Sequence, residues 1–317
     1  MTSECLPHQV IAAALRAGFT LIDTGELYGN EERIREGILL SGMHRESLIL
    51  SSKAGRWCEG ELPPTVAARL PAEYRSHAQQ GSPLLRGVYP TPRGTLGRGV
   101  CIGGAAETRA ALERTLARLG TEYVDLYLLH WPLTHAAYAL DDARHAAVRL
   151  EAWRELVRLK RRGKIRAIGV SNFSPRQIDE IAPIEIPQLV QVELHLQLQR
   201  PELRAYCEAR GILLQAYGHH RPELRAHPIL ALAAEVLTRG TSMAQSSSSV
   251  GLVGMRWSLQ AGVTVIPRSR RLAYVQDNAR VFEVPPLTDD MLQVLEGVDA
   301  NASLYGLHEA FVQDWIA

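Results

Sequence analysis

Four ionisable side chains stand where short apolar segments of the sequence end. Asp23, Lys53 and His130 each close or follow such a segment, and Tyr28 lies in the loop just beyond Asp23. If the segments are parallel strands of one barrel, their carboxyl ends meet at a single mouth, where barrel active sites are built. The sequence therefore predicts that these four side chains converge.

Such a set suits general acid catalysis. A phenol with an ordinary pKa of about 10 is a poor acid at neutral pH, but a nearby ammonium group stabilises the phenolate and lowers its pKa. A carboxylate keeps the lysine charged and in place, and a histidine orients the substrate oxygen or relays a proton. Together the four groups predict an acid for an oxygen that becomes an alkoxide after hydride transfer.

Each of these residues also has an ordinary structural explanation when taken alone. An aspartate after a strand can cap a turn, a loop tyrosine can pack, and a histidine at a strand end is as often structural as functional. The joint pattern favours chemistry. Lys53 is also one of three lysines, with Lys160 and Lys164, in a chain whose other basic residues are arginines, and a compact ammonium is not equivalent to a planar guanidinium.

The segments that must position these residues alternate between helical and strand-like patterns. Helices are expected at residues 7–17, 30–41, 105–119, 142–162, 175–181, 201–210 and 228–238. Strands are expected at residues 19–24, 47–52, 124–129, 165–170, 189–192, 212–216 and 263–266. Short apolar strands separated by helices indicate a parallel sheet buried on both faces. Because no GxGxxG turn follows a strand, the pattern favours an α/β (β/α)₈ TIM barrel, one domain over residues 1–317.

Two stretches interrupt this alternation. Residues 58–104 are rich in Gly, Pro and Arg and are expected to form a long loop excursion. Four consecutive serines at residues 246–249 fall where a helix is expected, and serine runs favour flexible coil.

The bulk composition is that of a globular protein with little net charge. The formal net charge is +1, which predicts no nucleic acid and no membrane among its partners. No apolar run reaches the roughly 18 residues of a membrane span, and no signal peptide is recognisable. Four scattered cysteines without a CxxC pair predict neither disulfides nor a thiolate zinc site. A cytoplasmic protein is expected.

Several segments, in a fixed order, resemble the aldo-keto reductases between about residues 8 and 298. They read GFTLIDT (18–24) with YGNE (28–31), EYVDLYLLHWP (122–132), GKIRAIGVSNF (163–173), VQVE (190–193) with His195, QAY (215–217) and VIPRS (265–269) leading to Asn278. The resemblance implies an oxidoreductase that reduces aldehydes or ketones to alcohols with NADP(H). It also implies a catalytic tetrad of Asp23, Tyr28, Lys53 and His130, with Tyr28 as the proton donor.

The resemblance assigns the nicotinamide end of the cofactor to residues of three strand ends. Ser171, Asn172 and Gln191 would hold the carboxamide. Tyr217 would stack on the ring and fix the face that delivers hydride.

The adenosine end falls to residues after the last strand. Arg268 and Ser269 match the positions that grip the 2′-phosphate, and Asn278 matches the adenine contact. Arg268 stands where the family usually has a lysine, and a guanidinium can bind phosphate bidentately. This favours NADP(H) over NAD(H).

The chain departs from the family pattern at three places. The family's opening strand has no counterpart before Pro7, which predicts a barrel incomplete at its N-terminal side unless another segment fills the gap. Gly218-His219-His220 replaces the usual Ser-Pro-Leu over the pyrophosphate, and the two histidines could contact phosphate instead. Tyr274 replaces an arginine of the adenosine site, for which Arg270 or Arg271 could compensate.

The substrate is expected to be a small-molecule carbonyl compound. Trp131 and Trp57 are candidates to line an apolar substrate pocket, although a packing role is as plausible for each. The excursion begins soon after Lys53 and could cover the mouth. Many members of the family act as monomers, and a monomer is expected.

Three alternatives remain open at this stage. The first is a non-catalytic NADP(H)-binding regulatory member of the same fold, like the channel-associated β subunits. The second is a defective truncated product. The third is a metal-dependent barrel hydrolase, and its candidate ligands are Asp23, His130, Glu193, His195 and His219. A barrel hydrolase normally has a His-x-His cluster early in the chain, and none is present.

Overall fold

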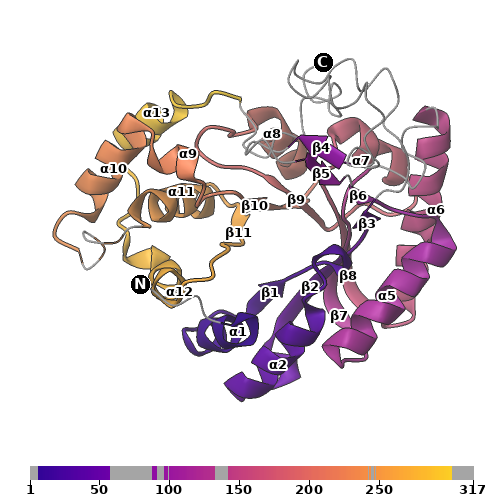
Figure 1. Ribbon diagram of the computed structural model, residues 1–317. Helices are drawn as coiled ribbons and strands as arrows, with labels where there is room; N and C mark the ends of the chain where they lie inside the picture. Colours follow the sequence, from indigo (N-terminus) through magenta and orange to yellow (C-terminus); the bar gives the residue numbers. More distant parts are fainter. Residues whose placement is uncertain are drawn as a thin grey trace.

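A main sheet of seven parallel strands, with helices between them, curls into a half-barrel in the computed structural model (Figure 1). The structure describes residues 6–57, 88–90, 96–98, 100–132, 142–241, 243, 246 and 248–301. Within these ranges the side chains of residues 56–57, 88–90, 96–98, 100–101 and 142–144 are not described. The predicted α/β barrel class is confirmed.

The strands of the main sheet match the expected ones closely. They are β1 (Leu21–Asp23), β2 (Ile49–Ala54), β7 (Val124–Leu129), β8 (Ile165–Ser171), β9 (Leu189–Glu193), β10 (Leu213–Tyr217) and β11 (Thr264–Val265). Their order in the sheet is β1-β2-β7-β8-β9-β10-β11, and neighbouring strands are parallel. Within the described residues, β1 and β11 form the two open edges of the sheet.

Helices cover the outside of the sheet. They are α1 (Pro7–Arg16), α2 (Glu31–Ser41), α5 (Ala105–Leu119), α6 (Asp142–Arg161), α7 (Pro175–Ile181), α8 (Pro201–Ala209), α9 (Pro222–Arg225), α10 (Pro228–Thr238), α11 (Ser249–Gln260), α12 (Leu272–Ala279) and α13 (Asp289–Glu296). Short 3₁₀ helices occupy Glu26–Tyr28, Arg45–Ser47 and Val281–Glu283. On the side where the sheet is open, α1 contacts α12 (Figure 1). No helix in the described ranges is long and apolar enough to cross a membrane.

Local sequence signals explain where these elements begin. Helix α7 starts as expected at a Ser-Pro boundary, because the Ser174 hydroxyl accepts a hydrogen bond from the Gln177 backbone N–H at 3.3 Å. The Ser174 backbone N–H donates in turn to Gln177 Oε1 at 3.0 Å, which completes a capping box. Strand β7 is buried along its whole length, as expected for a strand covered on both faces.

The two irregular stretches behave differently. In the excursion, β3 (Arg56–Trp57) pairs antiparallel with β6 (Val100–Cys101), and β4 (Val88–Pro90) pairs with β5 (Leu96–Arg98). Residues 58–87, 91–95 and 99 lie outside the described ones, so the expected loop is not tested there. The serine run does not interrupt α11, because its last member, Ser249, is the first residue of that helix.

Gly169 allows β8 to pack tightly between its two neighbours, which leads to a prediction. A β-carbon at this position would lie 2.3 Å from the Leu189 carbonyl oxygen and 2.8 Å from Leu128 Cδ2. Because backbone cannot move aside cheaply, Gly169→Ala should lower the free energy of unfolding by about 3 kcal/mol in urea titrations. Gly254→Ala is the matched control, since its β-carbon would meet no atom closer than 3.5 Å inside helix α11. Equal stability of the two variants would contradict this packing account.

Candidate active site

The side chains of Asp23, Lys53, Tyr28 and His130 lie together at the carboxyl ends of β1, β2 and β7. Lys53 Nζ donates to Asp23 Oδ2 and to the Thr24 carbonyl oxygen, the latter at 2.6 Å. The Tyr28 hydroxyl lies 3.3 Å from His130 Nε2, and Lys53 Nζ lies 5.4 Å from the centre of the Tyr28 ring. The four side chains therefore converge in the structure, as the sequence predicts.

Burial separates the roles of these groups. Lys53 is fully buried, whereas Tyr28 is 50% exposed. A buried ammonium requires an ionised partner and further acceptors, which Asp23 and Thr24 supply. The tyrosine therefore forms the solvent side of the cluster, and the ion pair forms its floor.

His130 is a neutral base in this setting. Burial, and secondarily the positive charge of Lys53, lowers the pKa of His130 well below its ordinary value. At neutral pH the imidazole is uncharged, so Nε2 either accepts from the Tyr28 hydroxyl or donates to it, depending on the tautomer.

Asn172 ties three strands together beside this cluster. Its φ angle of 62° is left-handed, a conformation that asparagine adopts more readily than most residues. Its Nδ2 donates to the His130 carbonyl oxygen at 3.0 Å and to Ser171 Oγ at 3.1 Å. Its Oδ1 accepts from the Tyr217 hydroxyl at 2.8 Å.

Gln191 contacts the Lys53–Asp23 ion pair through Asp23. Its Nε2 donates to Asp23 Oδ1 at 2.9 Å and to Gln215 Oε1 at 2.8 Å. The predicted nicotinamide residues Ser171, Asn172, Gln191 and Tyr217 are thus connected through hydrogen bonds to the predicted catalytic residues.

The residues expected at the adenosine end follow β11. Arg268 is exposed, and no acidic side chain of the described residues forms an ion pair with it. Ser269 Oγ accepts from the Arg271 N–H at 3.0 Å, and Arg271 lies over the Tyr274 ring. Asn278 is buried on α12 beside His220, and its side chain raises the pKa of that histidine against the larger, opposite effect of burial.

The loop after Tyr217 corrects one expectation. His219 is 2% exposed, and its Nε2 lies 2.9 Å from Ser258 Oγ on α11. His220 packs so closely on α11 that a β-carbon at Gly251 would lie 2.1 Å from its Nδ1. His219 therefore fastens the loop to α11 and is not free to contact phosphate. No sequence signal identified this role of His219, because it depends on Ser258, which lies far along the chain on α11.

The other candidates are placed less centrally. Trp131 is half-buried directly after His130, whereas the Trp57 side chain lies outside the described part of the chain. His195 Nε2 lies 3.2 Å from Glu193 Oε1, and both side chains are fully buried. No group of three or more His, Cys, Asp or Glu side chains in the described ranges is placed to hold a metal ion.

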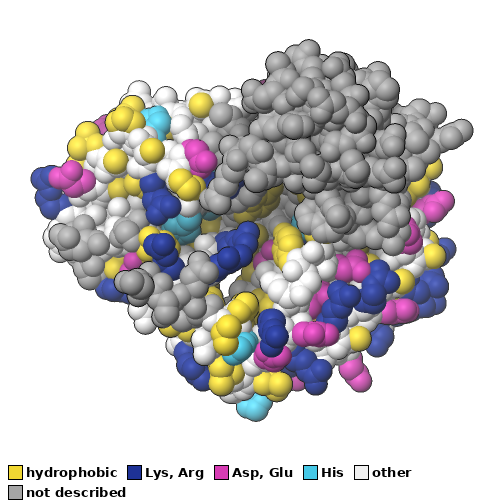
Figure 2. Space-filling model, in the orientation of Figure 1, with side chains coloured by type: hydrophobic (Ala, Val, Ile, Leu, Met, Phe, Trp, Pro, Cys, Tyr) yellow, Lys and Arg dark blue, Asp and Glu magenta, His cyan; other side chains and the backbone are white. Residues whose placement is uncertain are grey.

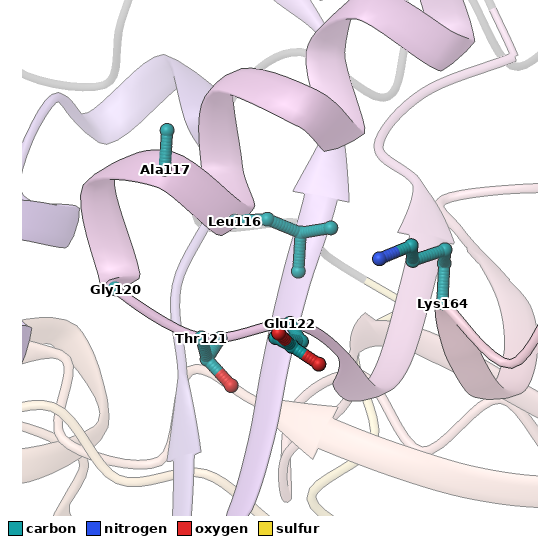
Figure 3. A pocket seen from close by; sticks show the side chains of 6 residues that line it. All are labelled: Leu116, Ala117, Gly120, Thr121, Glu122 and Lys164. Atoms are coloured by element: carbon teal, nitrogen blue, oxygen red, sulfur yellow. The ribbon is translucent and has the colours of Figure 1, made fainter.

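Two surface hollows lie at opposite ends of the main sheet. A small one adjoins the end of β2, and its lining residues are Glu26, Ala54, Gly55, Ile102, Gly103, Glu107, Thr108, Ala111 and Arg114. A shallow one lies at the opposite end, between the end of α5 and Lys164 before β8 (Figure 3). Only the first is near the catalytic cluster. In the view of Figure 2 the molecule is hollowed near its middle, with basic side chains beside the hollow.

Sequence reasoning assigned no role to two buried polar residues that touch the site. Ser51 Oγ donates to Asp23 Oδ1 at 2.7 Å, and Gln215 Oε1 accepts from Gln191. The sequence feature that could have identified them is a polar side chain within an otherwise apolar strand.

Comparisons with known proteins agree with this geometry. A model of the Aldo/keto reductase family matches residues 8–300. The oxidoreductase YtbE of Bacillus subtilis is 32% identical over 291 residues, 90% of this chain and 81% of that protein. A glyoxal reductase of the same organism is 33% identical over 284 residues, 89% of this chain and 79% of that protein.

Solved structures share the fold. An aldo/keto reductase of Brucella melitensis superimposes with a TM-score of 0.67 at 26% identity, covering 94% of this chain and 91% of that one. A Bombyx mori aldo-keto reductase in complex with NADP gives 0.69 at 22% identity, covering 98% and 86%.

The buried histidines predict a pH-dependent stability. Burial is the first cause that lowers the pKa of His130, His219 and His220. Their unfolded value is about 6.5, so below that pH the unfolded state binds more protons and stability falls, by up to about 1.4 kcal/mol per pH unit for each histidine. Urea unfolding between pH 7.5 and 5 should show this loss.

His219→Gln should flatten that dependence by about 1.4 kcal/mol per pH unit. The exposed His44, changed to Gln, serves as the control and should leave the slope as in the parent protein. A stability that stays constant from pH 7.5 to 5 would show that the histidines are not held neutral.

Proposed function

Because the chain belongs to the aldo/keto reductase family and is an oxidoreductase, we propose that it reduces small aldehydes and ketones with NADPH. Tyr28 would give the proton to the carbonyl oxygen. The observation that carries this proposal is the buried Lys53–Asp23 ion pair beside a half-exposed tyrosine whose hydroxyl reaches His130.

The residues present suit a nicotinamide nucleotide with a 2′-phosphate. Gln191 Oε1 accepts no hydrogen bond from the described residues, so it can take one from the carboxamide. Asn278, buried on α12 after the last strand, would meet the adenine amino group. The exposed guanidinium of Arg268 suits the 2′-phosphate.

When bound, a reduced nicotinamide cofactor would supply the hydride for the carbonyl carbon. Tyr28 Oη hydrogen-bonds the carbonyl oxygen and transfers its proton as negative charge develops there. Lys53 stabilises the phenolate that is left behind, and Asp23 holds Lys53 in position. Neutral His130 orients the substrate oxygen through Nε2 without adding a competing positive charge.

The name of one relative supports a proposal for the substrate class. The 33% identical Bacillus subtilis protein is a glyoxal reductase, and glyoxal is a small dicarbonyl compound. We propose that this chain takes carbonyl compounds of similar size, with the half-buried Trp131 beside the reacting group.

Replacing the proton donor should separate chemistry from binding. Tyr28→Phe is expected to lower kcat for glyoxal about 100- to 10,000-fold, while the Kd for NADPH from tryptophan fluorescence stays within about twofold. Tyr206→Phe is the control, because its hydroxyl bonds Asp179 on the outer helices. Full turnover by the Tyr28→Phe enzyme would remove Tyr28 from the mechanism.

Removing the guanidinium at position 268 should reveal the cofactor preference. We expect Arg268→Ala to raise the Kd for NADPH at least about tenfold and to leave NADH binding unchanged, because only NADPH carries the 2′-phosphate. Arg239→Ala, which removes an exposed arginine paired with Glu235, should change neither. Parent protein that binds neither nucleotide would refute the proposed function itself.

A further inference from the structure

The Asp23–Gln191 contact crosses the inside of the curved sheet. Asp23 belongs to β1 and Gln191 to β9, and three strands, β2, β7 and β8, separate them in the sheet. The two side chains nevertheless meet at 2.9 Å. Gln215 stands directly beside Gln191 on β10, because the two residues are register partners.

Chemistry fixes which way the Gln191 amide points. The Asp23 carboxylate receives Lys53 Nζ on Oδ2 and the Ser51 hydroxyl on Oδ1. An ionised carboxylate can only accept, so Gln191 must turn its NH₂ group towards it. The second amide hydrogen of that NH₂ group goes to Gln215 Oε1 at 2.8 Å.

With both hydrogens engaged, Gln191 Oε1 is left as a directed acceptor. Gln191 and Gln215 are 3% and 1% exposed, so bulk water does not substitute readily for either partner. Without the Gln215 carbonyl, the second N–H of Gln191 loses its acceptor. The amide can then rotate about its terminal torsion angle, whose distribution is broad when no partner holds it.

We propose that Gln215 is a positioning residue that fixes the Gln191 amide, so that Gln191 Oε1 selects a cofactor ring carrying a carboxamide N–H. This inference rests on the proposed function. It goes beyond that function because Gln215 touches neither cofactor nor substrate in this role and acts only through Gln191. The same Asp23 carboxylate serves both the proton-donor cluster and the carboxamide acceptor.

The test compares two ligands by isothermal titration calorimetry. NADP⁺ carries a carboxamide, whereas its 3-acetylpyridine analogue has a methyl ketone and no N–H to give to Gln191. Gln215→Met keeps the length of the side chain and removes its acceptor. We expect it to raise the Kd for NADP⁺ about five- to tenfold, the size of one hydrogen bond, and to change the Kd for the analogue less than twofold.

Two further variants keep the test decisive. Gln215→Asn remains polar but is one methylene shorter, and it should reproduce the same ligand-selective loss if the methionine variant does not fold. Thr264→Val, on the other side of Gln215, is the control. Its hydroxyl bonds the Leu214 carbonyl oxygen, and its removal should change neither Kd.

The outcomes are separable. If the parent protein binds NADP⁺ and a folded Gln215 variant binds it equally well, or loses NADP⁺ and the analogue by the same factor, the positioning role is refuted. If the parent protein binds neither ligand, the proposed function fails before Gln215 is tested.

Discussion

The arrangement of the site depends on one contact, the buried ion pair between Lys53 and Asp23. An ammonium group this far from water is stable only with an ionised partner and additional acceptors. Asp23 Oδ2 and the Thr24 carbonyl oxygen provide them. Both come from the end of β1, while Lys53 comes from β2. The pair therefore forms only in the register that sets Asp23 beside Ser51, and the chemistry of the cluster depends on that strand pairing.

The sequence was sufficient to predict the strands and the meeting of their carboxyl ends, because both follow from local rules. Alternating apolar and helical segments placed every strand of the main sheet close to its observed bounds, and parallel strands must present their carboxyl ends together. The Gln191–Asp23 contact could not be predicted in this way, since it joins non-neighbouring strands and depends on how tightly the sheet curls. The packing of His219 on α11 was equally inaccessible, because Ser258 and Gly254 lie far along the chain.

The open side of the sheet gives these interior contacts a second role. Strand β1 has three residues and lies at an edge, where one row of backbone groups lacks a strand partner within the described chain. The last residue of this strand is Asp23. Its side-chain carboxylate accepts three hydrogen bonds, from Ser51, Lys53 and Gln191, which hold the short strand from the inside of the sheet. Outside, α1 contacts α12 across the opening. The polar site thus helps to fix an edge that backbone pairing alone holds on one side only.

The charges of the cluster also depend on each other. Lys53 and Asp23 neutralise one another as a pair, yet the Lys53 cation still acts on the groups around it. It is the second cause, after burial, of the low pKa of His130, and it lies under the Tyr28 ring. Burial and this cation together therefore keep the imidazole neutral. In the proposed mechanism this leaves Tyr28, the half-exposed member, as the group from which a proton can leave towards the substrate.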